Sequence, residues 1–233
     1  MSTPAFTTRP DLRGDFGMVA STHWLASGVG MSVLERGGNA TDAAVAAGFV
    51  LQVVEPHLNG PGGEVPILLW DPAESAVRVI AGQGVTPAGA SIEHYLDQGL
   101  TMVPGTGLLA ATVPGAFGAW LTLLLRWGTW RLRDVLEPAI HYADNGFVVL
   151  PAISATIAAV VDTFERDWPH SAATWLPGGA VPVPGSRLRN PELADTWRRL
   201  LATAEGRSPA RGASNTAEGR SPARGASNTA EGR

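Results

Sequence analysis

Residues 37–63 read GGNATDAAVAAGFVLQVVEPHLNGPGG, and they contain the clearest structural signal in the chain. The pattern predicts a helix over 42–54, which is opened by residues 39–41 and has Asp42 in its first turn, where the helix dipole favours a carboxylate. Because this helix is apolar on all sides, we expect it to be buried between layers of structure. Pro56 ends it, since proline cannot continue a helix.

The flanking segments predict a mixed α+β fold. On the N-terminal side, Ser21 or Thr22 can cap a helix that ends at Gly37-Gly38. On the C-terminal side, strands at 65–70 and 76–81 are expected to form an antiparallel hairpin. The pattern also predicts helices near 91–98, 115–127, 132–144, 152–166 and 191–201. Helices outnumber the two predicted strands, which form only part of a sheet. We therefore expect an incomplete domain.

The chain divides into three segments by composition. Residues 1–16 are expected to be a flexible N-terminal segment, and residues 17–202 to be compact. Residues 203–233 repeat the 13-residue unit TAEGRSPARGASN and contain no Leu, Ile, Val, Met or aromatic side chain. Such a segment cannot bury enough apolar surface to offset its ordering entropy, so we expect a disordered tail.

Composition excludes several classes of function. The 233 residues include no Cys and no Lys, which rules out disulfides, thiolate metal sites and lysine-based catalysis. The net charge of -4 argues against nucleic-acid binding, and the longest uncharged stretch contains too many Pro and Gly residues for a membrane span. No two of the five His residues have the spacing of a helical metal site. We therefore expect no metal, no cofactor, no nucleic acid and no membrane partner.

Two short motifs have both a structural and a functional interpretation. Gly60-Pro61-Gly62-Gly63 is typical of a tight turn that needs positive φ angles, but its exposed backbone could also lie against a ligand. Ser21-Thr22-His23 could be a nucleophile motif, since an N-terminal Thr freed by autocleavage can attack an amide. Its position at a helix start favours an ordinary cap.

Several segments in register resemble the opening of the γ-glutamyltransferase (γ-glutamyltranspeptidase, glutathione hydrolase) family. The resemblance covers residues 17–202 and is confined to the large, N-terminal subunit. It rests on GMVAS at 17–21 with His23, LAS at 25–27, GGNA at 37–40, DAAVA at 42–46, VEPH at 54–57, Gly60 with Gly62-Gly63, VPG at 113–115, LEPAI at 136–140 and NGF at 145–147.

The resemblance implies an N-terminal nucleophile hydrolase with an αββα sandwich, of which this region is the large-subunit half. Enzymes of this family are made as one precursor that cuts itself, and the freed Thr of the small subunit attacks a γ-glutamyl amide such as glutathione. The acyl group then passes to water or to an amino acid or peptide. By this resemblance the partners are a C-terminal small-subunit half and a small-molecule amide, and Gly62 and Gly63 belong to the substrate-binding region.

This sequence departs from the family pattern in two respects. No Thr in the matched region corresponds to the catalytic nucleophile, so we expect no catalytic residue here and no activity from this chain alone. The family also places an Arg after the hairpin to hold the substrate α-carboxylate, and Gln83 stands at that position. Gln83 is thus a candidate substrate-binding residue that offers a neutral hydrogen bond in place of a charged fork.

Two other functions stay open at this point. The chain could be a non-catalytic interaction or binding module that kept the surface of the fold, or a non-functional truncated product of a tandem duplication. Since no export signal is visible, a cytoplasmic location is expected.

Overall fold

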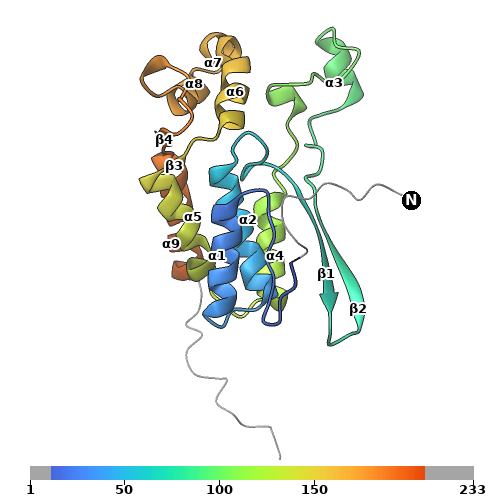
Figure 1. Ribbon diagram of the computed structural model, residues 1–233. Helices are drawn as coiled ribbons and strands as arrows, with labels where there is room; N and C mark the ends of the chain where they lie inside the picture. The colour runs from blue at the N-terminus through green and yellow to red at the C-terminus, as the bar shows by residue number, and fades with distance from the viewer. Residues whose placement is uncertain (1–11, 208–233) are drawn as a thin grey trace, which may run out of the picture.

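The computed structural model describes residues 12–207, so residues 1–11 of the expected N-terminal segment and most of the repeat lie outside this range. Figure 1 shows a central group of helices with a long hairpin on one side. The helices are α1 (Trp24–Glu35), α2 (Ala40–Val54), α3 (Ile92–Asp97), α4 (Ala116–Trp127), α5 (Leu132–Asn145), α6 (Pro151–Ala159), α7 (Val161–Asp167), α8 (Pro169–Trp175) and α9 (Pro191–Arg207), with 3-10 turns at Leu108–Ala110 and Pro177–Gly179. The strands are β1 (Val65–Asp71), β2 (Ala76–Gly82), β3 (Phe147–Val148) and β4 (Arg187–Leu188).

Helix α2 lies at the centre of the core, as its sequence predicts. It begins in a capping box, in which the side chains of Asn39 and Asp42 each accept a hydrogen bond from the other residue's backbone N–H. Eleven of its 15 residues are buried, and it packs against α1, α4 and α5. Phe49, which is fully buried, contacts the rings of Phe117, Trp120 and Trp197.

The hairpin β1–β2 is antiparallel and in the predicted place. Its inner residues, among them Ile67, Leu69 and Ile80, pack against the core. Its outer face carries Leu68, Trp70, Val77 and Val79, which are 59–73% exposed. One side of the sheet is therefore covered by helices, and the other side is apolar and open.

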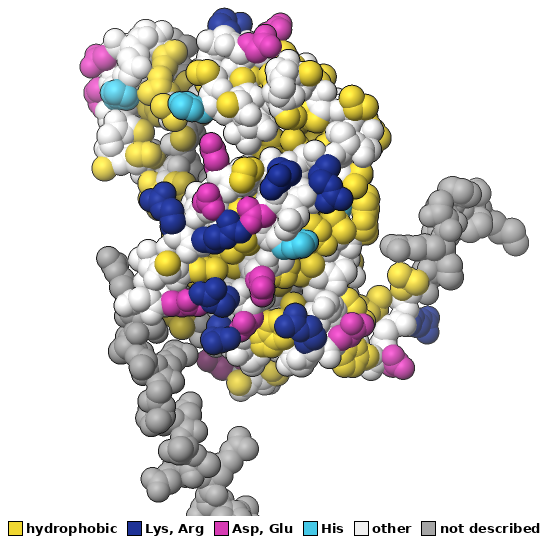
Figure 2. All heavy atoms as spheres, turned by 90° about the vertical axis from the view of Figure 1, so that its left-hand side faces the viewer, with side chains coloured by type: hydrophobic (Ala, Val, Ile, Leu, Met, Phe, Trp, Pro, Cys, Tyr) yellow, Lys and Arg dark blue, Asp and Glu magenta, His cyan; other side chains and the backbone are white. Residues whose placement is uncertain are grey.

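Helices α5 and α9 form the opposite side of the molecule. Figure 2 shows acidic and basic side chains interspersed on this face. Many of these charges are paired: Arg133 Nε donates to Glu205 Oε1 at 2.8 Å, and Arg198 pairs with Asp144 and Asp195. This face is consequently lined by charged pairs, whereas the outer face of the hairpin is apolar.

The secondary structure differs from the predicted elements in three places. The helix expected over 152–166 is broken at Val160, whose φ of -120° and ψ of 9° interrupt the helical backbone. Helix α8 and the short β3–β4 pair were not predicted. Helix α9 continues to Arg207, five residues into the repeat, because it packs along α5 and Glu205 pairs with Arg133. The remaining residues of the predicted disordered tail lie outside the described range.

The first helix also begins differently from expectation. His23, rather than Ser21 or Thr22, is the N-cap of α1, and its Nδ1 accepts a hydrogen bond from the Leu25 N–H at 3.2 Å. Ser21 Oγ instead donates to the His23 carbonyl, and Thr22 donates to Glu55. In the described residues, no helix combines the length and apolar character needed to cross a membrane.

Candidate substrate site

Gly62 and Gly63 lie in the loop between α2 and β1, directly beside the start of α4. The Gly63 carbonyl accepts hydrogen bonds from the backbone N–H groups of Gly115 and Ala116, at 3.2 and 3.0 Å. These N–H groups belong to the first turn of α4, where helical donors have no partner within the helix. The loop is thus fixed to the helix by its own backbone.

The expected positive φ angles are not found in this loop. Gly60, Gly62 and Gly63 are absent from the glycines with φ in the left-handed region, so the turn prediction was wrong on this point. Added to Gly62, a Cβ would meet no atom within 4 Å. Neither backbone conformation nor packing within the described chain therefore requires glycine at position 62.

Gln83 follows β2 and lies at the same end of the hairpin as the glycine loop. The strand register pairs Val65 with Gly82, which makes Glu64 the neighbour of Gln83 across the hairpin end. Both side chains are exposed. The structure therefore brings Gln83, Gly62 and Gly63 together near the N-terminus of α4, although 20 residues separate the two parts in sequence.

Glycines around Gln83 allow backbones to approach closely. A Cβ on Gly82 would lie 2.6 Å from Ala119 Cβ, and one on Gly115 would lie 2.8 Å from the Gln83 carbonyl carbon. A Cβ on Gly84 would overlap the Val113 carbonyl group. Because real Cβ atoms do not approach so closely, these three glycines fix the position of the Gln83 backbone against α4.

Four buried acidic or histidine side chains were not identified from sequence as part of a polar framework: His23, Asp42, Glu55 and Asp71. Asp71 accepts from the Trp127 indole N–H at 2.9 Å, which ties the hairpin to the end of α4. Among the described residues, no group of three or more His, Cys, Asp or Glu side chains could hold a metal ion.

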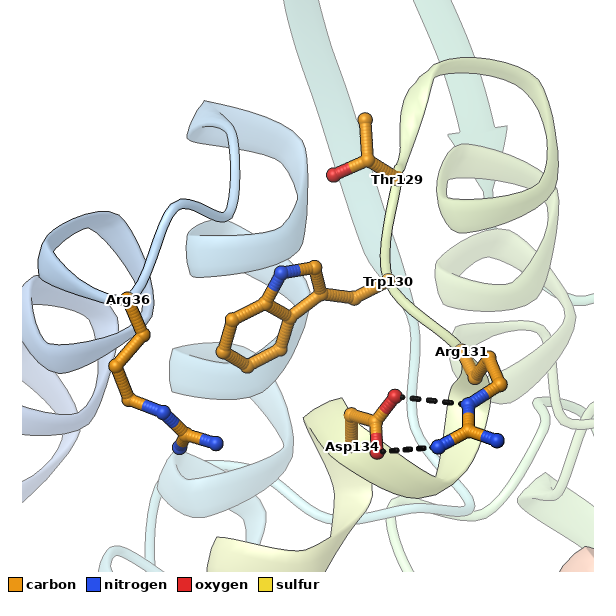
Figure 3. A pocket seen from close by; sticks show the side chains of 5 residues that line it. All are labelled: Arg36, Thr129, Trp130, Arg131 and Asp134. Carbon is orange, nitrogen blue, oxygen red and sulfur yellow. Dashed lines mark hydrogen bonds and ion pairs between the residues drawn. The ribbon is translucent and has the colours of Figure 1, made fainter.

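A separate surface depression of about 340 Å³ lies at the other end of α2. Figure 3 shows that Arg36, Trp130 and Asp134 line it together with Thr129 and Arg131. The Arg36 guanidinium lies 4.9 Å from the centre of the Trp130 ring, and Asp134 pairs with Arg131. Since α2 is about 20 Å long, this depression is distinct from the glycine loop.

Known proteins match this region closely. A profile described as "Gamma-glutamyltranspeptidase" matches residues 26–208. The glutathione hydrolase-like YwrD proenzyme of Bacillus subtilis is 38% identical over 192 residues, which cover 82% of this chain and 36% of that protein. The acylase ACY 1 proenzyme of Pseudomonas sp. (strain SE83) is 40% identical over 204 residues, covering 83% of this chain and 36% of that protein.

Solved structures agree with these matches. LmbA2991T421A is 60% identical with a TM-score of 0.83, over 86% of this chain and 34% of that one. The γ-glutamyltranspeptidase of Helicobacter pylori is 30% identical with a TM-score of 0.77, over 83% of this chain and 56% of that one. These structures define the class as a partial N-terminal nucleophile hydrolase fold of the α+β type, which confirms the predicted fold class.

The chain belongs to the γ-glutamyltranspeptidase family, as its sequence motifs indicated. It spans about a third of the length of the curated relatives that it matches. The matched portion corresponds to the N-terminal, large-subunit region.

Proposed function

We propose that this chain is the large-subunit portion of an amide-cleaving or acyl-transferring enzyme of the γ-glutamyltransferase type. The family match over residues 26–208 and the similarity to two proenzymes support this proposal. In this view the chain contributes part of the substrate pocket, and a C-terminal half supplies the nucleophilic Thr. The substrate is a small-molecule γ-glutamyl or related amide. The Thr hydroxyl attacks its carbonyl carbon and the amine leaves, and water or an amino acid then takes the acyl group from the ester and frees the Thr hydroxyl.

The outer face of the hairpin supports the expectation of a second half. Leu68 lies opposite Val79 in the strand register, and Trp70 lies opposite Val77, so four exposed apolar side chains form two adjacent cross-strand pairs. A contiguous apolar sheet face is typical of a surface that is covered in the assembled protein. We infer that the C-terminal half covers this face.

Without that half, we expect the chain to self-associate through the same surface, because a bare apolar sheet is an aggregation hazard. The double substitution Leu68→Glu and Val79→Glu should shift the chain toward the monomer in sedimentation velocity. As a matched control, Leu125→Glu on α4 changes a side chain that is also exposed, at 74%, but lies off this face. A monodisperse wild-type monomer would contradict the prediction and favour a stand-alone binding module.

The chain alone is expected to have no transferase or hydrolase activity. Incubation with a chromogenic γ-glutamyl anilide should give no product above a buffer blank, since no Thr of the matched region corresponds to the family nucleophile. A complete proenzyme of the family serves as the positive control for the assay. Turnover by the purified chain would overturn the two-part proposal directly.

Gln83 bears on the choice of acyl group. An amide side chain holds a carboxylate by a hydrogen bond from an uncharged donor, whereas a guanidinium offers a charged bidentate fork. We propose that glutamyl recognition is weakened at this position, or that the pocket takes an acyl group without an α-carboxylate. The existence of an acylase among the relatives, acylase ACY 1, is compatible with the second possibility.

Substituting Gln83→Arg in a complete protein that carries this region tests that argument. The KM for a γ-glutamyl anilide should fall about fivefold, the equivalent of about 1 kcal/mol for a charged over a neutral hydrogen bond. Gln98→Arg is the control, because Gln98 is also exposed but follows α3, beyond the hairpin end. An unchanged KM in the Gln83 variant would remove the assigned role of this residue.

A further inference from the structure

The depression at the end of α1 contains a guanidinium group that pairs with no acidic side chain among residues 12–207. Arg36 is the C-cap of α1 and is exposed. Its guanidinium lies over the Trp130 ring, 4.9 Å from the ring centre. In Figure 3, Arg36 approaches Trp130 from one side, and Arg131 and Asp134 lie on the other. Stacking on a ring uses the face of a guanidinium and leaves the N–H donors at its edge for a ligand.

Arg131 supplies the second guanidinium of the depression, and a carboxylate already holds part of it. Its Nε and Nη2 donate to the two carboxylate oxygens of Asp134, at 3.1 and 3.3 Å. Arginine has five N–H donors, so this pairing leaves further donors on Arg131. The Arg131 side chain is also 81% exposed, so no buried contact prevents it from turning toward an anion.

Hydrogen bonds to a buried carboxylate fix the segment that carries Trp130. The backbone N–H groups of Thr129 and Trp130 donate to Asp42 at 2.9 and 3.1 Å, and Asp42 is fully buried. The ring also packs on the connection between α1 and α2, since a Cβ on Gly38 would lie 3.2 Å from Trp130 Cε2. The aromatic wall of the depression is therefore preformed, which lowers the entropic cost of binding a ligand there.

The depression has an excess of positive charge. Arg36 and Arg131 line it, and Asp134 is the one acidic side chain among the lining residues of the described chain. Arg133 and Glu205 also act on Arg131, but these two side chains form an ion pair with each other. They consequently leave the charge excess of the depression in place, and this excess favours an anion.

We propose that this depression binds the carboxylate or phosphate group of a small molecule, with Arg36 as the main donor and Arg131 as the second. A guanidinium matches both groups, because its paired N–H donors fit two oxygens of the same anion. The volume of about 340 Å³ is at the lower end of the range for ligand sites, which suits a small molecule. The site is distinct from the glycine loop, and the proposal does not depend on amide cleavage.

An NMR titration of the full chain tests the proposal with two probes, inorganic phosphate and acetate, each at constant ionic strength. The Trp130→Phe variant identifies the Trp130 indole N–H signal among those of the eight Trp residues. This signal should shift in a saturable manner, and phosphate should half-saturate it at the lower concentration because phosphate carries more charge. The probe that binds more tightly identifies the preferred anion. The same titration of the Leu68→Glu, Val79→Glu chain removes any contribution from self-association.

Arg36→Gln should raise the half-saturating concentration about tenfold or more, because a charged hydrogen-bond donor is lost. Arg126→Gln is the matched control. Arg126 is also exposed and its guanidinium lies 5.9 Å from the centre of the Trp127 ring, but it does not line the depression. This control should change the half-saturating concentration by less than about twofold, since salt screens exposed charges outside the site.

Asp134→Asn tests the site in the opposite direction. It removes the carboxylate that competes for Arg131, so the half-saturating concentration should fall severalfold. Damage to the fold cannot produce tighter binding, so this variant keeps the proposal testable even if another variant unfolds. A Trp130 signal that responds to neither probe, or that responds alike in the wild type and in Arg36→Gln, would overturn the proposal. These readouts need no turnover, so this proposal and the proposed function fail separately.

Discussion

Replacing Asp42 with alanine is expected to lower the free energy of unfolding by about 3 kcal/mol or more, because several donors lose their partner at once. Asp42 is 0% exposed. Its carboxylate accepts from the backbone N–H groups of Asn39, Thr129 and Trp130 at 2.9, 2.9 and 3.1 Å, and from Thr129 Oγ1 at 2.6 Å. It therefore joins the start of α2 to the α4–α5 connection.

The measurement is thermal or urea unfolding followed by circular dichroism at several chain concentrations. Asp42→Asn keeps the shape but only one acceptor oxygen, so it should cost about half as much as the alanine variant. Asp97→Ala, at an exposed position of α3, is the matched control and should stay within about 0.5 kcal/mol of the wild type. Equal stability of the Asp42 and Asp97 variants would show that the hydrogen bonds of Asp42 contribute nothing.

The pKa of Asp42 determines how the free energy of unfolding should change at acidic pH. Burial alone would raise the pKa of Asp42, but the hydrogen bonds from Thr129, Asn39 and Trp130 outweigh it and hold the pKa below 3.8. A depressed pKa means that the stabilisation is complete above the unfolded value and is lost as the pH falls through the folded value. In the Asp42→Asn variant, the free energy of unfolding should therefore fall less steeply at acidic pH than in the wild type. An unchanged acid dependence would contradict the lowered pKa of Asp42.

The sequence predicted those helices and strands whose start and end are set by residues close together in the chain. The helix-opening residues Asn39 and Asp42, the proline after α2 and the two apolar strand runs of the hairpin are each contained within a few residues. The break at Val160 was missed because its flanking residues have no helix-breaking composition. The β3–β4 pair joins Phe147 to Leu188, and so short a pair, between strands so far apart in sequence, leaves no local periodicity.

The candidate site was found by a different route. Gln83, Gly62 and Gly63 were chosen because they resemble family positions, and no local pattern placed them together. Their proximity depends on α4, which contacts both the loop and the end of β2. The hydrogen bonds of Asp42 to Thr129 likewise span 87 positions in sequence, so only the tertiary structure could reveal them.

Gly84→Ala is expected to destabilise the fold by about 2 kcal/mol or more and to displace Gln83, because the added methyl group has no space. The Cβ would lie 2.8 Å from the Val113 carbonyl carbon and 2.9 Å from Thr112 Oγ1. Val113 N–H donates to the Val85 carbonyl at 3.0 Å, so the two backbones cannot separate without breaking a hydrogen bond. The strain must therefore move the segment that carries Gln83.

Gly62→Ala provides the matched control in the same site. Its Cβ would contact nothing within 4 Å and its φ is not in the left-handed region, so stability should change by less than about 0.5 kcal/mol. In a complete protein, the Gly84 variant should also raise the KM for an amide substrate beyond its effect on folding. Two glycine variants that unfold alike would mean that the close approach of residues 84 and 113 does not hold Gln83 in place.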